Sequence, residues 1–452
     1  MDKDSILFRK TPSLTAANRK NNNRRAQDYL IFYYFCKVKR PESVISLKSS
    51  NSMKIIHTSD WHLGQYLYTF DRRIEHQAFL DQLVQIVHDA QPDAMVVSGD
   101  IFHSIAPSVK AQKMYTDAMI RIHDAAPDMP VFITAGNHDS ASRLEVDSNL
   151  WQLANVHVVG TLRHTADGQV DWHGHIFRVD GKCIIAAVPF LSTHNFPPAP
   201  EGEDRQKYFF RTLGEKVQKV NPQHLPVVLM AHLAVRGCDI TGHKEDDNHT
   251  GAGGLDYVSP DVFGDNFDYV ALGHIHRPQT LSGTGKCIRY SGSPIPVNVN
   301  EDYRHSVTIV DFNDGNLPKL STHEILNPLP LRVVPKQPAY TEEALKALAQ
   351  LPDDQPMYVF MNVKTRDAFD PDIDERAVEA LKGKQCRFCR HLATFENQPA
   401  DEIRDDITPE ELADMSLQQV AGRYMDQLGI HSQEFDEMLD EAVRQVEEER
   451  HK

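Results

Sequence analysis

The sequence lacks an apolar run long enough to cross a lipid bilayer. A membrane-spanning helix needs about 20 consecutive apolar residues, whereas the longest candidate, residues 29–36, is short and aromatic and is followed by basic residues. It resembles a secretory signal poorly, because no small-residue cleavage site follows it. We therefore expect no membrane association, and we interpret this segment as an ordinary strand or as part of a non-native extension.

Cysteine is scarce, and the six cysteines are scattered at positions 36, 183, 238, 287, 386 and 389. Several have apolar, strand-like neighbours, a setting in which cysteine is usually a small buried side chain. Because this spacing is not that of a disulfide framework, we expect a reducing, cytoplasmic location. Cys386 and Cys389, with His391 close behind, resemble half of a zinc site, but one pair is weak evidence and we favour a structural role.

A surplus of basic charge is also missing. The chain has 48 Lys and Arg residues against 64 Asp and Glu residues, which gives a formal net charge of −16. Residues 1–52 carry +7, so the remaining residues carry −23. An acidic body argues against indiscriminate binding to nucleic acids. It does not exclude an enzyme in which bound cations and a few basic residues face phosphate groups.

A length of 452 residues predicts two or three domains. We interpret residues 1–52 as a basic N-terminal extension, disordered or not native, rather than as an arm that contacts DNA, because the first clear strand begins at Met53. In the predicted main domain, residues 53–325, strands first alternate with helices, which predicts a largely parallel sheet. Strands dominate after about residue 170, which suggests a second sheet packed on the first.

Four prolines between residues 328 and 338 mark a domain boundary. We expect residues 326–400 to form a small α+β domain. In residues 401–452, apolar side chains recur at helical spacing in two segments, which begin at Thr408 and Ser432. These helices either pack on the protein's own core or dock on a partner, and the pattern does not decide between the two.

Side chains of the metal-binding types follow five apolar, strand-like segments, among which residues 95–98 are the most central. The side chains in question are Asp60 and His62, Asp100, Asn137, His232, and His274 with His276. In open sheets flanked by helices, ligands bind at the carboxyl ends of the strands. Because those ends meet at one edge, we expect the seven side chains to form a single metal site.

Seven oxygen and nitrogen ligands without cysteine suit two divalent ions that share one carboxylate, and Asp100 is the natural bridge. Mn²⁺ fits this set better than a structural zinc ion, which prefers cysteine. Two such ions can hold a phosphodiester and activate a shared water for in-line attack on phosphorus. We expect His138 to protonate the leaving alkoxide and Asp139 to hold the His138 ring in the correct tautomer.

A single His or Asp at a strand end is usually a turn residue, but five such motifs in this order do not arise by chance. The segments SDWHLG (59–64), SGDIFH (98–103), AGNHD (135–139) and ALGHIHRP (271–278) resemble the calcineurin-like metallophosphoesterases. More narrowly, the chain is similar to the DNA double-strand-break-repair nucleases within that superfamily, whose pattern the segment YSGSP (290–294) also matches. The resemblance runs from about residue 53 to 325 and weakens beyond residue 330.

The resemblance implies a four-layer α-β-β-α sandwich with a small α+β capping domain and C-terminal helices. By position, it assigns one manganese ion to Asp60, His62, Asp100 and His276, and the other to Asp100, Asn137, His232 and His274. It also implies that His138 is the proton donor and that His103 helps to position the substrate phosphate.

The same resemblance implies a 3′-to-5′ exonuclease on duplex ends that is also an endonuclease on single strands and hairpins. Such nucleases work as a homodimer with an ATPase, which together form a nucleoid-associated heterotetramer. The capping domain would contact DNA, and the C-terminal helices would bind the ATPase. If the ATPase carries much of the grip on DNA, the nuclease itself needs no basic surface.

Other functions are open at this point. The main alternative is a metallophosphoesterase that acts on a small phosphodiester or nucleotide, which would use the same ligands. The additional residues 330–452 favour the nuclease, because a small-molecule hydrolase would not need them. A non-catalytic scaffold is disfavoured by the complete ligand set and by His138. A protein phosphatase is disfavoured because the arginine expected in the second motif does not follow Asp100.

Overall fold

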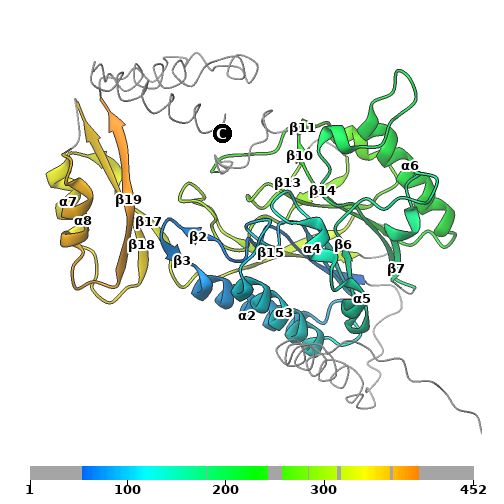
Figure 1. Cartoon of the computed structure of the whole chain (residues 1–452), viewed down its shortest axis with the longest axis horizontal. Helices are drawn as coiled ribbons and strands as arrows, with labels where there is room; N and C mark the ends of the chain where they lie inside the picture. The colour runs from blue at the N-terminus through cyan, green and yellow to red at the C-terminus, as the bar shows by residue number, and fades with distance from the viewer. Residues whose placement is uncertain are drawn as a thin grey trace, which may run out of the picture.

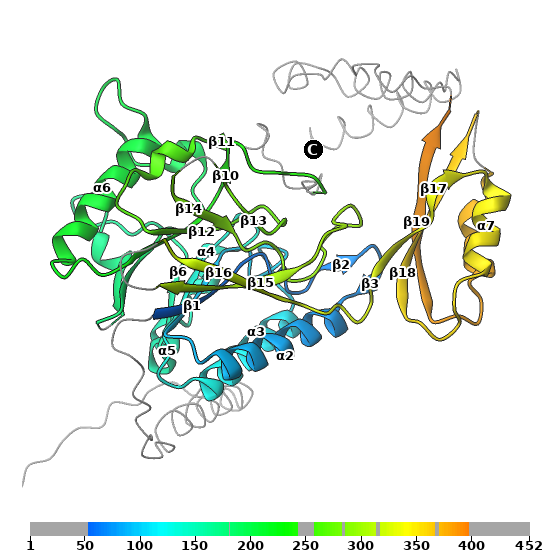
Figure 2. The same cartoon turned by 180° about the vertical axis from the view of Figure 1, so that it is seen from behind.

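The computed structural model describes residues 53–179, 181–242, 257–282, 285–312, 317–366 and 370–396. The N-terminal extension and the C-terminal helices predicted from the sequence lie outside these residues. The described chain contains three large sheets with their helices, which Figure 1 and Figure 2 show from opposite sides.

The first sheet has six strands in the order β16-β15-β1-β4-β5-β6. Its strands are β1 (Met53–Thr58), β4 (Ala94–Ser98), β5 (Val131–Thr134), β6 (Val156–Val159), β15 (Ser306–Phe312) and β16 (Lys319–Glu324). The first four are parallel, and β15 and β16 extend the sheet in antiparallel pairing. Parallel strands need long crossovers, which here contain α2 (Arg73–Ala90), α3 (Val109–Ala125), α4 (Ala141–Glu145) and α5 (Ser148–Trp151).

Strand β4 shows how the sequence produces this layer. Successive side chains of a strand point to opposite faces. Met95 and Val97 pack in the cluster that contains the helix residues, whereas Ala94 and Val96 belong to the cluster shared with the second sheet. Because both faces are covered, every residue of β4 is buried and residues 94–97 are an unbroken apolar run.

The second sheet has the order β13-β14-β12-β9-β8-β7. Its strands are β7 (Ile176–Val179), β8 (Cys183–Ala187), β9 (Val227–His232), β12 (Tyr269–Gly273), β13 (Gln279–Thr280) and β14 (Cys287–Tyr290). One face packs on the first sheet, and α6 (Arg205–Val220) packs on the other. The order helix, sheet, sheet, helix confirms the predicted four-layer sandwich.

Helix α6 is missing from the sequence-based prediction, which has mainly strands in this region. Phe209, Phe210, Leu213 and Val217 are its buried side chains, and their spacing is helical. The sequence therefore contains the spacing that indicates this helix, but the apolar runs that indicate strands on either side of it are more prominent.

The smaller elements connect these layers. They are the hairpin strands β2 (Tyr66–Leu67) and β3 (Phe70–Asp71), the short strands β10 (Ala234–Val235) and β11 (Tyr257–Val258), and the 3₁₀ turns Gln152–Ala154, Trp172–Gly174, Thr193–Asn195 and Pro260–Phe263. None of the helices in the described part of the chain has the length and apolar character needed to cross a bilayer.

The third sheet is a separate parallel sheet of β17 (Leu331–Ala339), β18 (Met357–Thr365) and β19 (Cys386–Phe395), in that order. Helices α7 (Thr341–Ala349) and α8 (Ile373–Ala380) pack on one face. The opposite face contacts the β2–β3 hairpin of the sandwich, where Leu67 joins Leu329, Tyr358 and Phe360 in one apolar cluster (Figure 2).

The two cysteines of β19 belong to different faces of this sheet. Cys386 packs against the cluster that contains α7 and α8, whereas Cys389 packs against the cluster at the β2–β3 hairpin. Both are free thiols. This arrangement does not form half of a zinc site, and it agrees with a structural role for both residues.

Candidate metal centre

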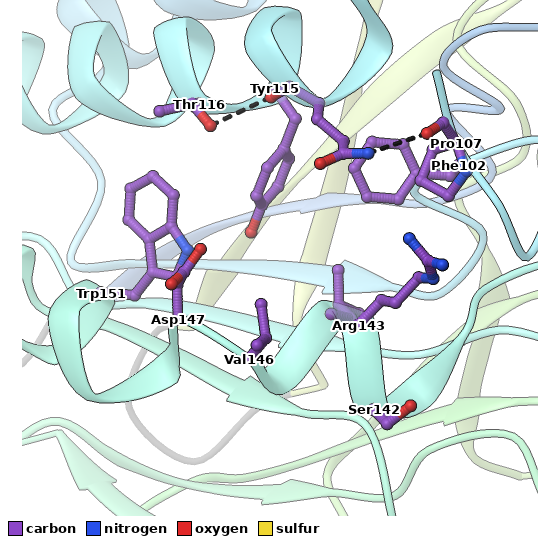
Figure 3. A pocket seen from close by; sticks show the side chains of 11 residues that line it. Phe102, Pro107, Tyr115, Thr116, Ser142, Arg143, Val146, Asp147 and Trp151 are labelled. Atoms are coloured by element: carbon purple, nitrogen blue, oxygen red, sulfur yellow. Dashed lines mark hydrogen bonds between the residues drawn. The ribbon is translucent and has the colours of Figure 1, made fainter. Parts of the chain in front are cut away.

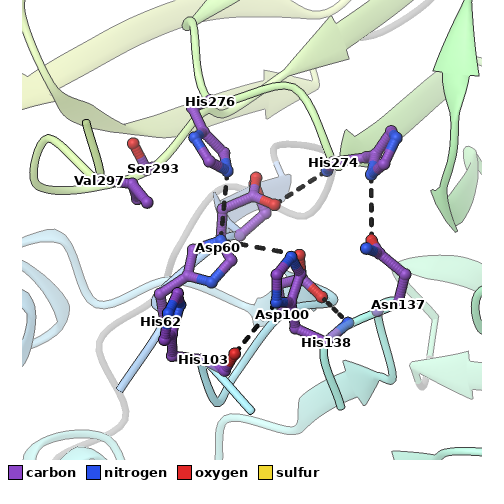
Figure 4. Close-up of polar contacts among 12 residues, drawn as sticks. Asp60, His62, Asp100, His103, Asn137, His138, His274, His276, Ser293 and Val297 are labelled. Atoms are coloured by element: carbon purple, nitrogen blue, oxygen red, sulfur yellow. Dashed lines mark hydrogen bonds and ion pairs between the residues drawn. The ribbon is translucent and has the colours of Figure 1, made fainter. Parts of the chain in front are cut away.

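All five predicted strand ends meet at one edge of the sandwich. The loops after β1, β4 and β5 deliver Asp60, His62, Asp100 and Asn137 from the first sheet, and β9 and the loop after β12 deliver His232, His274 and His276 from the second. Figure 4 shows residues from both sheets pointing into a common space. The structure therefore brings together all seven side chains that the sequence motifs single out.

Four of these residues have an unusual backbone. The φ angles of Asp60, His62, Asp100 and His274 are 53°, 45°, 52° and 93°. Residues other than glycine rarely adopt positive φ, and such strain clusters at functional sites. At each strand end, the strained turn changes the direction of the backbone within one or two residues, so that the ligand side chain faces the site.

Glycine precedes three of the ligand candidates because the backbones approach too closely for a side chain. A Cβ on Gly136 would lie 2.1 Å from Asp100 Oδ1, and a Cβ on Gly99 would lie 2.2 Å from His232 Nδ1. At Gly273 the corresponding distance to the Ser98 carbonyl oxygen is 1.9 Å. The Gly-Asp, Gly-Asn and Gly-His motifs are thus a packing requirement of the site.

The first two loops are joined through their backbones. The N–H of Asp60 donates to the carbonyl oxygen of Gly99 at 3.0 Å, and that of His62 donates to the carbonyl oxygen of Asp100 at 3.0 Å. A third bond, from Leu63 to Ile101, continues the pairing at 2.9 Å. These bonds fix the separation of the two loops that carry the carboxylates.

Asp100 lies between the two groups of histidines. Its Oδ2 atom is 3.7 Å from His62 Nε2 and 3.3 Å from His232 Nε2, and its Oδ1 accepts the backbone N–H of His138 at 2.9 Å. Burial alone would raise the pKa of Asp100, but the neighbouring histidines, His232 above all, hold that pKa well below its usual range. Asp100 is therefore a permanent anion at the centre of the site.

Asp60 is the second central carboxylate. Its oxygens accept the Ser59 hydroxyl at 2.6 Å and the backbone N–H of His274 at 2.9 Å. Close groups of possible donor atoms include Asp60 twice, once with His62 and His276 and once with Asp100 and His232. Burial raises the pKa of Asp60, a penalty that a bound cation would relieve.

Hydrogen bonds at Nδ1 set the tautomers of two histidines. His232 Nδ1–H donates to the Ser98 carbonyl oxygen at 2.8 Å, and His276 Nδ1–H donates to Glu301 Oε1 at 2.8 Å. In neutral rings this leaves both Nε2 atoms unprotonated, and a partner at the remote nitrogen is typical of metal-binding histidines. Burial lowers the pKa of either ring, but the anionic neighbours Asp100 and Glu301 outweigh it and raise these pKa values to about 9.

The donor atoms converge as expected for divalent ions. His62 Nε2 and His276 Nε2 face each other at 3.2 Å, and burial lowers the pKa of His62 well below its usual range, so this ring is neutral. Asn137 Oδ1 is 3.0 Å from His232 Nε2 and 3.1 Å from His274 Nδ1. Carboxylate, amide and imidazole donors facing a common space fit a divalent metal centre, whose ions would displace the protons of His232 and His276 on binding.

His138 and His103 border this centre. Their rings are stacked, with centroids 5.6 Å apart, and the His62 ring is 4.9 Å from that of His138. His138 Nδ1–H donates to the carbonyl oxygen of His103 at 3.0 Å, which leaves Nε2 as the reactive nitrogen in the neutral ring.

The predicted role of Asp139 is wrong in this respect, because the His103 carbonyl, not Asp139, holds the His138 ring. The Asp139 carboxylate instead accepts three backbone N–H groups, from Ile101, Phe102 and Gly136. Burial and the charge of Asp100 raise the pKa of Asp139 to about 7. Adjacent residues in a tight loop point in different directions, so Asp139 anchors the loops while His138 faces the site.

Two residues of the site were missed from the sequence. Glu301 lies in the loop before β15 and contacts His276, and Tyr290 of β14 accepts the Val235 N–H and donates to the Leu233 carbonyl beside His232. Tyr290 is part of a motif noted in the sequence, but Glu301 has no periodic or motif signal around it. Only the folded structure brings it to the metal centre.

Comparison with known proteins agrees with this geometry. Residues 53–278 match the calcineurin-like phosphoesterase family. The SbcD subunit of the nuclease SbcCD from Rhodobacter capsulatus is 37% identical over 66% of this chain and 76% of that protein. The corresponding proteins of Escherichia coli K12 and Bacillus subtilis 168 are 29% and 30% identical, over 73% and 58% of this chain and 82% and 67% of those proteins.

The fold and the site therefore define a calcineurin-like phosphoesterase, a metal-dependent hydrolase of phosphodiester bonds. Within this class, the chain belongs to the SbcD family.

Proposed function

We propose that this protein is the DNA nuclease subunit of an SbcCD-type complex in DNA repair and recombination. The observation that supports this most directly is the convergence of seven metal-type side chains beside His138 in a chain of the SbcD family. The proposed activities are 3′-to-5′ exonuclease on duplex DNA and endonuclease on single strands and hairpins.

We assign one metal position to Asp60, His62, Asp100 and His276, and the other to Asp100, Asn137, His232 and His274. Bound divalent ions would act as Lewis acids at the phosphodiester and lower the pKa of a shared water. The contacts of Asp100 Oδ2 with His62 on one side and His232 on the other support its place as the shared ligand. Mn²⁺ is the proposed ion because the donors are oxygen and imidazole nitrogen without thiolate.

His138 is the proposed general acid. Its Nδ1–H is occupied by the His103 carbonyl, so a proton carried on Nε2 can pass to the leaving alkoxide. His103, stacked on His138, would contact the phosphate. Asp139 serves the reaction indirectly, because it holds the loops that present Asp100 and His138.

The remaining assignments concern partners. Residues 53–325 would be the nuclease domain and residues 326–400 a capping domain that contacts DNA, with the C-terminal helices of residues 401–452 bound to an SbcC-type ATPase. Removal of residues 401–452 is expected to abolish co-purification with that ATPase and to leave hydrolysis of a small phosphodiester intact. Retained co-purification would place the ATPase contact elsewhere.

A homodimer is the proposed state of the nuclease, and α3 with the α4–α5 segment offers a surface for it. A cavity of about 440 Å³ opens there, and Figure 3 shows Tyr115, Val146 and Trp151 around it. Val146, which lines it, is 76% exposed, and Val109 at the start of α3 is 81% exposed. A Val146→Asp variant is expected to be monomeric by light scattering, and a dimer of unchanged stability would exclude this surface.

The deciding experiment is a Mn²⁺-dependent cleavage assay on a hairpin and on a blunt duplex. His138→Ala is expected to lose activity on both by roughly 10²-fold or more, the usual contribution of a general acid, while the metal content stays at the wild-type value. Full activity in this variant would remove the proposed proton donor. Activity confined to nucleotide-sized esters would instead favour a small-molecule phosphodiesterase.

A further inference from the structure

The Glu301 carboxylate occupies a special place behind His276. Its side chain is fully buried, and Oε1 accepts His276 Nδ1–H at 2.8 Å. The other oxygen accepts the Val297 N–H at 3.1 Å and the Ser293 hydroxyl at 3.3 Å. With both oxygens engaged, Glu301 cannot rotate, so it fixes both the tautomer and the direction of the His276 ring.

The same hydrogen-bonded series continues away from the metal centre. The Gln65 side-chain NH₂ donates to the Val297 carbonyl at 2.9 Å, and Gln65 Oε1 accepts from Arg72 Nη1 at 2.6 Å. Arg72 Nη1 also donates to the Pro296 carbonyl at 2.6 Å. The Gln65 N–H also donates to the His62 carbonyl oxygen at 3.1 Å, so the series contacts the His276 ring through Glu301 and the His62 backbone through Gln65.

Arg72 is the far end of the series and is itself unusual. Its side chain has no exposed surface, and its Nε pairs with the equally buried Glu75 at 2.9 Å. A buried charge is tolerated only when its partners are fixed, and removal of one partner is strongly destabilising. The nearby Phe70 packs against Tyr358 of the third sheet, so Arg72 lies where the sandwich meets that sheet.

We propose that Glu301, Gln65 and Arg72 are positioning residues for one of the two metal positions, the one assigned to His62 and His276. Of the two histidines assigned to the other position, His232 is oriented by the Ser98 carbonyl instead, so the two positions have separate supports. This inference rests on the proposed metal assignment, and it adds that the two ions depend on different residues.

The test is Mn²⁺ binding by equilibrium dialysis, followed by electron paramagnetic resonance of the bound ions. In Glu301→Gln, an amide can present its NH₂ to His276 and force the ring into the wrong tautomer. Loss of such a partner typically costs 10- to 100-fold in metal affinity. We expect this loss of affinity for only one of the two ions. In the electron paramagnetic resonance spectrum, the signal of two coupled Mn²⁺ ions should disappear.

Two further variants complete the design. Gln65 lies further along the series from His276, so Gln65→Met is expected to lower the affinity for the same ion by a smaller factor. This variant keeps the test informative if Glu301→Gln folds poorly. Glu145→Gln is the matched control, because its carboxylate also accepts a backbone N–H, from Gly160 at 2.8 Å, but lies outside the series. Its Mn²⁺ binding is expected to match the wild type.

The outcomes separate this inference from the proposed function. If His276→Ala keeps both ions at wild-type affinity, the metal assignment itself is wrong. The positioning role is wrong if His276→Ala weakens the binding of one ion but Glu301→Gln binds both ions with wild-type affinity. It is also wrong if Glu301→Gln weakens the binding of both ions equally.

Discussion

Replacement of Asp139 by Asn tests whether this carboxylate anchors loops or orients His138. Asp139 Oδ2 accepts N–H groups from Gly136 at 2.9 Å and from Ile101 at 3.1 Å, and Oδ1 accepts that of Phe102 at 2.9 Å. An amide has one oxygen. If it takes the place of Oδ2, it keeps two bonds and presents NH₂ to the Phe102 N–H, which then has no acceptor.

The expected magnitude follows from this count. One buried donor without an acceptor costs about 1–3 kcal/mol, so Asp139→Asn should lose that much stability. In proteins of 150–250 residues, 1 kcal/mol shifts Tm by roughly 2–4 °C, so a decrease of roughly 2–12 °C is expected. Asp139→Ala removes all three acceptors and should melt at a still lower temperature.

The assay combines thermal unfolding without metal with the rate of DNA cleavage. The His138 ring is held by the His103 carbonyl, so Asp139→Asn should cleave DNA more slowly than the wild type but much faster than His138→Ala. Asp268→Ala, which removes the acceptor of the Val227 N–H far from the site, is the control for an ordinary lost bond. An unchanged Tm combined with a rate as low as that of His138→Ala would refute the anchoring role.

The other predictions concern the same centre. Gly136→Ala places a Cβ 2.1 Å from Asp100 Oδ1 and should lower both Tm and Mn²⁺ content. A Cβ on Gly168 has nothing within 4 Å, so Gly168→Ala should lower only the stability, by the roughly 1–2 kcal/mol that left-handed backbone costs. Equal loss of Mn²⁺ in the two variants would contradict this prediction. Asp100→Ala should release both ions and His276→Ala chiefly one, so equal residual metal in the two variants, measured by mass spectrometry, would exclude the bridging assignment. Tyr290→Phe leaves two buried backbone groups unpaired, each at about 1–3 kcal/mol, and should lower the free energy of unfolding in urea by roughly 2–6 kcal/mol, a loss that a wild-type midpoint would disprove.

The sequence predicts the parts of the site that follow from strand geometry. Apolar runs such as residues 95–98 identify buried strands, and parallel strands necessarily bring their ends together, so Asp60, Asp100 and Asn137 can be grouped from the sequence alone. The alternation of strands and helices predicts the parallel sheet, whereas the four-layer sandwich is what the resemblance to the calcineurin-like phosphoesterases implies. Helix α6 was missed although its buried side chains have helical spacing, because strand-like segments dominate the sequence on both sides of it.

Contacts made by loops could not be predicted in this way. Glu301 is 25 residues from His276 along the chain, in a segment without secondary structure, so no periodicity indicates which way it points. The role given to Asp139 failed for a related reason. Its neighbour His138 is adjacent in sequence, but side-chain direction in a tight loop depends on φ and ψ, which the sequence does not specify.

The strained backbone of the site is stabilised by contacts between loops. Asp60, His62 and Asp100 all have positive φ, and each such residue costs of order 1–3 kcal/mol unless its surroundings hold it. Here the loops hold each other, because the backbone bonds from Asp60 to Gly99 and from His62 to Asp100 join two strained turns. A change in either loop therefore removes support from the other, and the effects of paired substitutions should not be additive. The protein thus supports its ligand geometry through bonds between its own loops.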